Sequence, residues 1–142
     1  MARGHACRAQ LSLEYLLLLA AFFSVLLLML PLIQRAYALA LFGFDARQAE
    51  SFSRDFAQKA RQLSILSENS VLSIEIQPLQ EWQISASGKK LVVSFGSKQL
   101  GKTKTIETEL FADFALFEKT ASGKTVLVLE KKGGLLVVNS NA

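Results

Sequence analysis

Cysteine and histidine are almost absent from this chain of 142 residues, which holds one of each, Cys7 and His5. A disulfide needs two cysteines, and a structural zinc site needs about four Cys or His ligands. The carboxylates of the second half, among them Glu75, Glu81 and Asp113, are scattered, and no two are spaced as an acid–base pair. The sequence therefore predicts no enzyme activity, no cofactor and no metal site.

Charge of either sign is also sparse, at 20% of the residues, and the net charge is +4. The lysines stand singly or in pairs through the C-terminal half. Such spacing indicates a solvated surface, whereas a nucleic-acid site gathers its basic residues in a stripe. No nucleic-acid partner is predicted.

One long segment, in contrast, has no charge at all. From Leu16 to Ile33 only Ser24 and Pro31 interrupt the aliphatic and aromatic run. As a helix it would be about 27 Å long, close to the roughly 30 Å of a bilayer core, and residues 11–15 extend it. We expect a membrane-length helix over residues 11–33.

Glu14 lies at the mouth of this segment. An acidic side chain costs roughly 2.5 to 3.5 kcal/mol at the centre of a bilayer and less near the interface. Signal peptides and simple anchors have no use for such a residue. Glu14 is therefore expected to have a functional partner.

Three interpretations of the N-terminus remain open. A removed secretory signal fits the small residues of Ala36-Tyr37-Ala38 or Ala38-Leu39-Ala40, although its usual apolar core is only about 7 to 15 residues long. A plain N-terminal anchor is the second. A leader that is cut before the apolar segment, so that the segment is kept, is the third, and it alone accounts for Glu14.

The junction itself reads Gln10-Leu11-Ser12-Leu13-Glu14-Tyr15, preceded by Ala9 and a short basic leader with Arg3 and Arg8. It resembles the class III signal peptide of archaeal type IV pilins, Gln-x-Ser-x-Glu-Phe/Tyr, in which Gly more often stands where Ala9 does. The resemblance covers about the first third of the chain. It implies cleavage between Ala9 and Gln10 by a prepilin peptidase, with Gln10, Ser12, Glu14 and Tyr15 as the leader motif.

Such a cut would release Arg3 and Arg8 and create an α-amine at Gln10, about one helical turn from Glu14. In a stack of parallel helices, Glu14 of one subunit can neutralise the amine of a neighbour. Such a pair is strong at low dielectric and costly when one partner is missing. We expect Glu14 to set the axial stagger during assembly.

After Ile33 the helical pattern becomes amphipathic and runs to about Asn69. Pro31 is expected to kink this helix and Gly43 to allow a second bend. Its apolar residues recur at three- and four-residue spacing, which predicts a stripe packed on a core. They are Phe44, Ala49, Phe52, Phe56, Ala60, Leu63 and Leu66.

From Val71 the pattern changes to strands, with turns predicted at Ser87-Gly88, Ser122-Gly123 and Lys132-Gly133-Gly134. Two runs, Val126–Leu129 and Leu135–Val138, do not alternate, which suggests central strands covered on both faces. Short loops favour an antiparallel meander packed on the helix. The predicted strands are Val71–Gln77, Trp82–Ala86, Leu91–Phe95, Thr103–Glu109, Phe111–Phe117, Thr125–Glu130 and Leu135–Asn139.

The predicted fold class is therefore α+β, with a long N-terminal helix on a C-terminal antiparallel sheet. We expect a cleaved leader at 1–9, a pilin-type helix at 10–69 and a β-rich domain at 70–142.

One motif points elsewhere. Gly96-Ser-Lys-Gln-Leu-Gly101-Lys102-Thr103 matches the phosphate-loop pattern G-x-x-x-x-G-K-[ST]. That motif binds phosphate only where the loop opens a helix. Here Thr103 to Thr108 alternates as a strand does, so a hairpin loop is predicted. Trp82 is interpreted as a core residue.

The resemblance implies a structural subunit of a cell-surface filament, membrane-bound as a precursor, with adhesion as the expected role. Its implied partners are further copies of itself, a prepilin peptidase, an assembly ATPase and a membrane platform protein. The alternatives are a single-pass anchored extracytoplasmic binding protein and a minor pilin or pseudopilin. Motility, DNA uptake and secretion stay open as roles.

Overall fold

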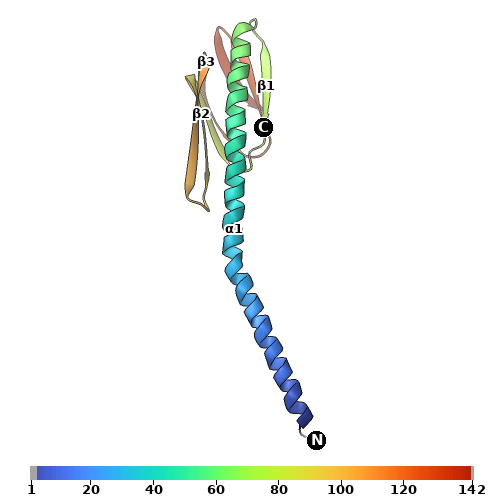
Figure 1. Ribbon diagram of the computed structural model, residues 1–142. Coiled ribbons are helices and arrows are strands. Elements are labelled where there is room, and N and C mark those ends of the chain that lie inside the picture. Colours follow the sequence, from blue (N-terminus) through green and yellow to red (C-terminus); the bar gives the residue numbers. More distant parts are fainter. Residues whose placement is uncertain (1–2, 142) are drawn as a thin grey trace. The chain divides into compact units, whose positions relative to one another are not determined.

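The computed structural model describes residues 3–141, and their side chains from Leu13 to Ser140. One long helix, α1 (Arg3–Ile65), precedes five strands (Figure 1). The predicted α+β fold, with a helix packed on a mostly antiparallel sheet, is confirmed. The chain divides into two compact units, 1–37 and 38–142, so that α1 contributes to both. The strands are β1 (Val71–Ile76), β2 (Trp82–Ser97), β3 (Lys102–Ala121), β4 (Thr125–Lys132) and β5 (Leu135–Asn141).

In the first unit, α1 keeps its helical assignment through Pro31, and in the second it does so through Gly43. The Ser24 hydroxyl donates a hydrogen bond to the Ala20 carbonyl one turn earlier, at 2.8 Å. This satisfies the one hydroxyl of the apolar run inside its own helix.

In the second unit, the apolar stripe of α1 forms the core with the inner face of the sheet. Phe56 is fully buried, and its ring lies 5.3 Å from that of Phe114. The prediction that Phe44 and Leu66 belong to this stripe is wrong, because Phe44 is 63% exposed and Leu66 lies beyond the helix end. Phe44 is eight residues before Phe52, which places it about 80° around the helix from the stripe.

The helix ends at Ile65, four residues before the predicted end, and β4 contributes to that end. The Lys131 ammonium donates to the carbonyl oxygens of Ser64 and Leu66, at 3.0 and 2.8 Å. The chain then turns through Asn69, whose φ is 66°, and pairs with the Lys131 backbone. Carbonyls at a helix end need such partners, and here they come from a distant strand.

The strand order is β1-β4-β5-β3-β2, so the predicted meander is wrong in its order. β3 and β5 run parallel, with Phe114 opposite Leu136, whereas the other neighbours are antiparallel. The chain crosses from one edge strand, β1, to the other edge strand, β2. That connection is fastened to α1 by two hydrogen bonds described below.

β2 and β3 each unite two of the predicted strands. The predicted turn at Ser87-Gly88 is not a hairpin, because the β2–β3 pairing continues past it with a register shift on either side of Gly88. β2 nevertheless folds back there, since the rings of Trp82 and Phe95 are 6.0 Å apart. If β2 were straight, the thirteen residues from Trp82 to Phe95 would instead separate these side chains by about 43 Å.

The other turns are confirmed, with positive φ at Gly123, Gly133 and Gly134. β4 and β5 are central, as predicted, but only one of their faces is fully buried. Along β4 the buried residues alternate with half-buried ones. Leu127 and Leu129 face the core that contains Phe52 and Phe56.

Candidate functional site: an apolar helix and a hairpin loop

The N-terminal part of α1 is apolar on all sides. An 18-residue window of it has a mean hydropathy of 2.9, and none of that window is buried. The consecutive residues Leu16, Leu17 and Leu18 are 62 to 69% exposed, although each points about 100° away from the one before. A helix that is apolar all round needs a membrane or a protein interior around it. This segment is compatible with a single membrane span.

Glu14 and Tyr15 are exposed at the start of the described side chains, Tyr15 to 75%. Within the part of the chain whose side chains are described, no group forms a hydrogen bond or ion pair with Glu14. Ala9, Gln10 and Ser12 lie within α1, but their side chains fall outside the described range. The cleavage and assembly roles of these residues stay predictions.

The phosphate-loop pattern lies on the hairpin between β2 and β3, as the alternation of Thr103 to Thr108 predicts. Gly96 pairs with Thr103 across the hairpin, and Lys102 begins a strand rather than a helix. A Cβ on Gly96 would lie 3.2 Å from Thr103 Oγ1 and 3.3 Å from the Lys102 carbonyl oxygen. The first glycine therefore allows two strands to approach closely, and Gly101, with φ 59°, completes the turn.

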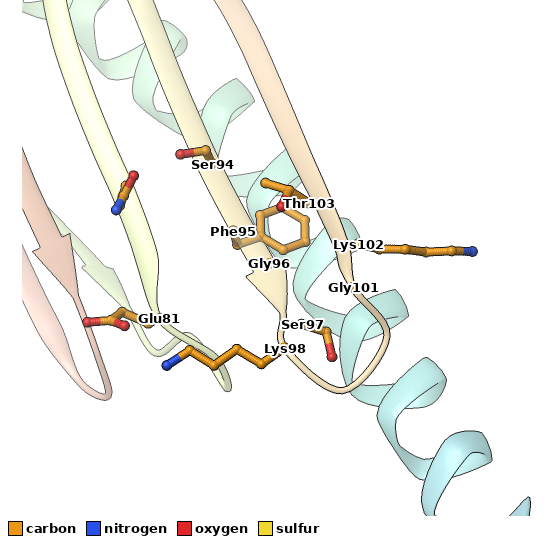
Figure 2. Close-up of a pocket in the computed structure, with 10 residues that line it drawn as sticks. Glu81, Ser94, Phe95, Gly96, Ser97, Lys98, Gly101, Lys102 and Thr103 are labelled. Atoms are coloured by element: carbon orange, nitrogen blue, oxygen red, sulfur yellow. The ribbon is translucent and has the colours of Figure 1, made fainter.

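A shallow pocket of about 430 Å³ lies between this hairpin tip and the start of β2. Figure 2 shows the Lys98 side chain extending toward Glu81, whereas Lys102 points away from the other lining residues. A phosphate cradle needs backbone N–H groups at a helix N-terminus together with a converging lysine. A carboxylate and a diverging lysine do not provide one.

The remaining predicted assignments concern Trp82, the carboxylates and metals. Trp82 is fully buried, with its ring 6.2 Å from that of Phe52, so its interpretation as a core residue is confirmed. Glu75, Glu81 and Asp113 are exposed. Among the described residues there is no group of three or more His, Cys, Asp or Glu side chains that could hold a metal ion.

The sequence reasoning missed Asp45, which is fully buried. Its Oδ1 accepts a hydrogen bond from the Leu79 backbone N–H at 3.0 Å, and the Gln48 amide donates to the Gln77 carbonyl at 3.1 Å. Both bonds hold the connection between β1 and β2 against α1. Asp45 lies four residues before Ala49 and therefore on the same side of the helix as the buried stripe. This spacing could have predicted from the sequence that Asp45 is buried.

A second contact joins α1 to β3. The Lys104 ammonium donates to Glu50 Oε1 at 2.8 Å, and both side chains are partly exposed. This hydrogen bond, together with the positive charge of Lys104, lowers the pKa of Glu50 below its ordinary value of 4.5, and the charge of Arg54 lowers it further. The negative charge of Glu50 is therefore already paired with a positive charge of its own chain.

No protein-family model, curated protein or solved structure matches this chain. Its function is therefore inferred from its own residues, chiefly from the exposed apolar helix that follows Glu14.

Proposed function

We propose that this protein is the structural subunit of an archaeal type IV pilus-like surface filament. The observation that carries this proposal is an apolar segment of α1 that is exposed on every side and follows a carboxylate, Glu14. In the precursor the segment spans the membrane once. After cleavage between Ala9 and Gln10, the same segment packs against those of neighbouring subunits.

The physical reason is the apolar surface that the helix presents. Once a subunit leaves the bilayer, this surface must be covered, at roughly 25 cal/mol for each Å² of apolar area removed from water. Copies of one helix can cover each other in a head-to-tail contact. A heterologous contact of that kind does not close on itself and produces an open filament.

Glu14 supplies the register in this proposal. Within its own chain no described group neutralises it. The α-amine of Gln10 in a neighbouring subunit is the expected partner. The peptidase, the assembly ATPase and the platform protein are implied by the resemblance of the leader. The β-rich unit would coat the filament, where adhesion is the expected role.

N-terminal sequencing of the native protein tests the processing step. A chain that starts at Gln10 supports the proposal. An intact leader contradicts it and favours the single-pass anchored protein, whose only requirement is the same membrane-length helix. A start near Leu39 or Leu41 would mean that the apolar segment is a removed secretory signal.

The substitution Glu14→Gln tests the assembly step. We expect cleavage to continue while the yield of sheared filaments falls more than about tenfold, because the neighbour's buried amine loses its partner. Glu81→Gln, which changes an exposed carboxylate far along the chain, is the matched control. Wild-type filament yield from Glu14→Gln would disprove the role of this residue.

Mass spectrometry of sheared filaments then separates a major from a minor subunit. As a major pilin, the chain dominates the filament fraction. As a minor pilin or pseudopilin, it has the processed N-terminus but a low abundance there.

A further inference from the structure

Three arginines of α1 form a row on its exposed surface in the second unit. Arg47, Arg54 and Arg61 are all exposed and are spaced seven residues apart. In a straight helix, positions seven apart differ by only about 20° around the axis and by about 10.5 Å along it. The three guanidinium groups therefore belong to one side of the helix.

The chain itself compensates only part of this charge. Glu50, which lies between Arg47 and Arg54, forms an ion pair with Lys104, and the charge of Arg54 also lowers its pKa. The Arg61 guanidinium lies 4.9 Å from the centre of the Phe111 ring. Among the described side chains, no carboxylate forms an ion pair with Arg47 or Arg54. Two arginines are thus available to a partner.

A complementary surface lies on β3, whose exposed positions alternate with covered ones from Thr105 to Asp113. The exposed side carries Glu107, Glu109 and Asp113, and Glu118 is exposed further along. Glu107 lies opposite the neutral residue Val92 on β2, and Glu109 lies opposite Lys90. This acidic side of β3 has more carboxylates than opposing cations.

The acidic side of β3 also exposes a large apolar residue, Phe111, which is 73% exposed. Leu116, further along β3 and beyond a shift in its pairing with β2, is 82% exposed. Apolar residues rimmed by charged ones are typical of protein–protein interfaces. A nucleic acid or another polyanion would not bind this side of β3, so a protein partner is favoured for it.

We propose that the Arg47 and Arg54 side of α1 binds the acidic side of β3 on a second copy of this chain. In the regularly paired part of β3, Glu107 and Glu109 are about 7 Å apart, and long arginine side chains that start about 10.5 Å apart can converge on them. The planar guanidinium group of arginine can bind a carboxylate in a bidentate manner, through two parallel N–H···O hydrogen bonds. The inference builds on the proposed filament, because polymerisation brings copies next to one another.

Cysteine cross-linking of the full chain tests this contact. In a Cys7→Ser background, Ser51→Cys lies on the arginine side and Thr105→Cys on the acidic side, and all the charges stay in place. We expect disulfides between differently tagged copies at these two positions, about tenfold above the control of Ser122→Cys with Thr105→Cys, because Ser122 is exposed on the turn after β3 and not on α1. The yield should fall between 0.1 and 1 M salt, as the screening length drops from about 10 to 3 Å.

Charge reversal provides a second, independent readout. Arg47→Glu with Arg54→Glu should lower the cross-link yield at least about tenfold, because like charges then face each other. Adding Glu107→Lys and Glu109→Lys should restore it. Lys98→Glu with Lys124→Glu makes the same charge change on two other turns and should have no effect. Fluorescence of the buried Trp82 verifies that each variant is folded.

The outcomes separate this contact from the filament itself. Filaments that start at Gln10 but show no link between positions 51 and 105 would overturn the contact and leave the proposed function intact. A link in protein that keeps its leader and forms no filament would support the contact alone. Binding of duplex DNA by Arg47 and Arg54 without any link would also overturn it.

Discussion

Phe44 and Phe56 lie about three turns apart on α1, yet their surroundings are opposite. Phe44 is 63% exposed, whereas Phe56 is fully buried between Phe52 and Phe114, with ring centres 5.7 and 5.3 Å away. The same residue type therefore contributes very differently to stability. Hydrophobicity alone does not distinguish the two positions, but their angle around the helix does.

We predict that Phe56→Ala lowers the free energy of unfolding by about 3 to 5 kcal/mol, because it leaves a cavity in the core. Phe44→Ala should change it by no more than about 0.5 kcal/mol. Denaturant unfolding of the full chain in detergent, followed by Trp82 fluorescence, measures both. Equal losses from the two variants would contradict the described core.

At the scale of the element, β2 depends on one backbone conformation. Gly88 has a φ of 55° at the point where the strand folds back and its pairing with β3 shifts. A Cβ at this position would meet no atom within 4 Å. The requirement for glycine is therefore a matter of backbone conformation and not of space.

Gly88→Ala should accordingly destabilise the protein by about 1 to 2 kcal/mol, because an L-residue is strained at positive φ. Gly88→Asn should cost less, since asparagine tolerates this region better. Gly43→Ala is the control of opposite sign. It also has open space around its Cβ, but it lies in α1, where alanine should add about 0.5 to 1 kcal/mol. Thermal unfolding measures the stability of the three variants. If Gly88→Ala raised the Tm as Gly43→Ala is expected to do, this account of Gly88 would be wrong.

At the scale of the whole molecule, the two units require different surroundings. The second unit has its own core, in which Trp82, Phe56 and Leu63 are fully buried. The first unit has none among its described side chains, since every residue from Leu13 to Tyr37 is exposed. The chain therefore combines a unit that has its own buried core with an exposed apolar helix that is compatible with a membrane span.

Leu26→Lys tests that requirement. A lysine in the middle of the apolar run should cost roughly 2.5 to 3.5 kcal/mol on insertion and move the protein out of the carbonate-resistant membrane fraction. Leu66→Lys, at an exposed position after α1, should leave that fraction unchanged. Full membrane retention of Leu26→Lys would argue against the span.

Local signals account for the parts of the fold that were predicted correctly. The period of the apolar residues predicts α1, and glycine marks the turns at Gly123, Gly133 and Gly134. The hairpin at Gly96 to Thr103 was predicted because an alternating segment follows it. The roles of Ala9, Gln10, Ser12, Glu14 and Tyr15 are implied by the resemblance of the leader, and they stay predictions.

The features that were missed depend on residues far apart in the sequence. The end of α1 involves Lys131, some 65 residues later, and the path from β1 to β2 involves Asp45 on the helix. The Leu79 N–H, which lies beside Asp45 in the folded chain, satisfies one of the two oxygens of this buried carboxylate. No local sequence pattern predicts that Asp45 and Leu79 lie next to each other.

The sequence by itself determined the membrane-length helix, the amphipathic helix that follows it and the change to strands, because each depends on the order of neighbouring side chains. Only the tertiary structure decided the strand order, the folding back of β2 and the placement of the arginines of α1 and the acids of β3 on exposed surfaces. These features depend on which distant backbone and side-chain groups satisfy one another's hydrogen bonds, charges and apolar contacts, and that is settled when the whole chain packs.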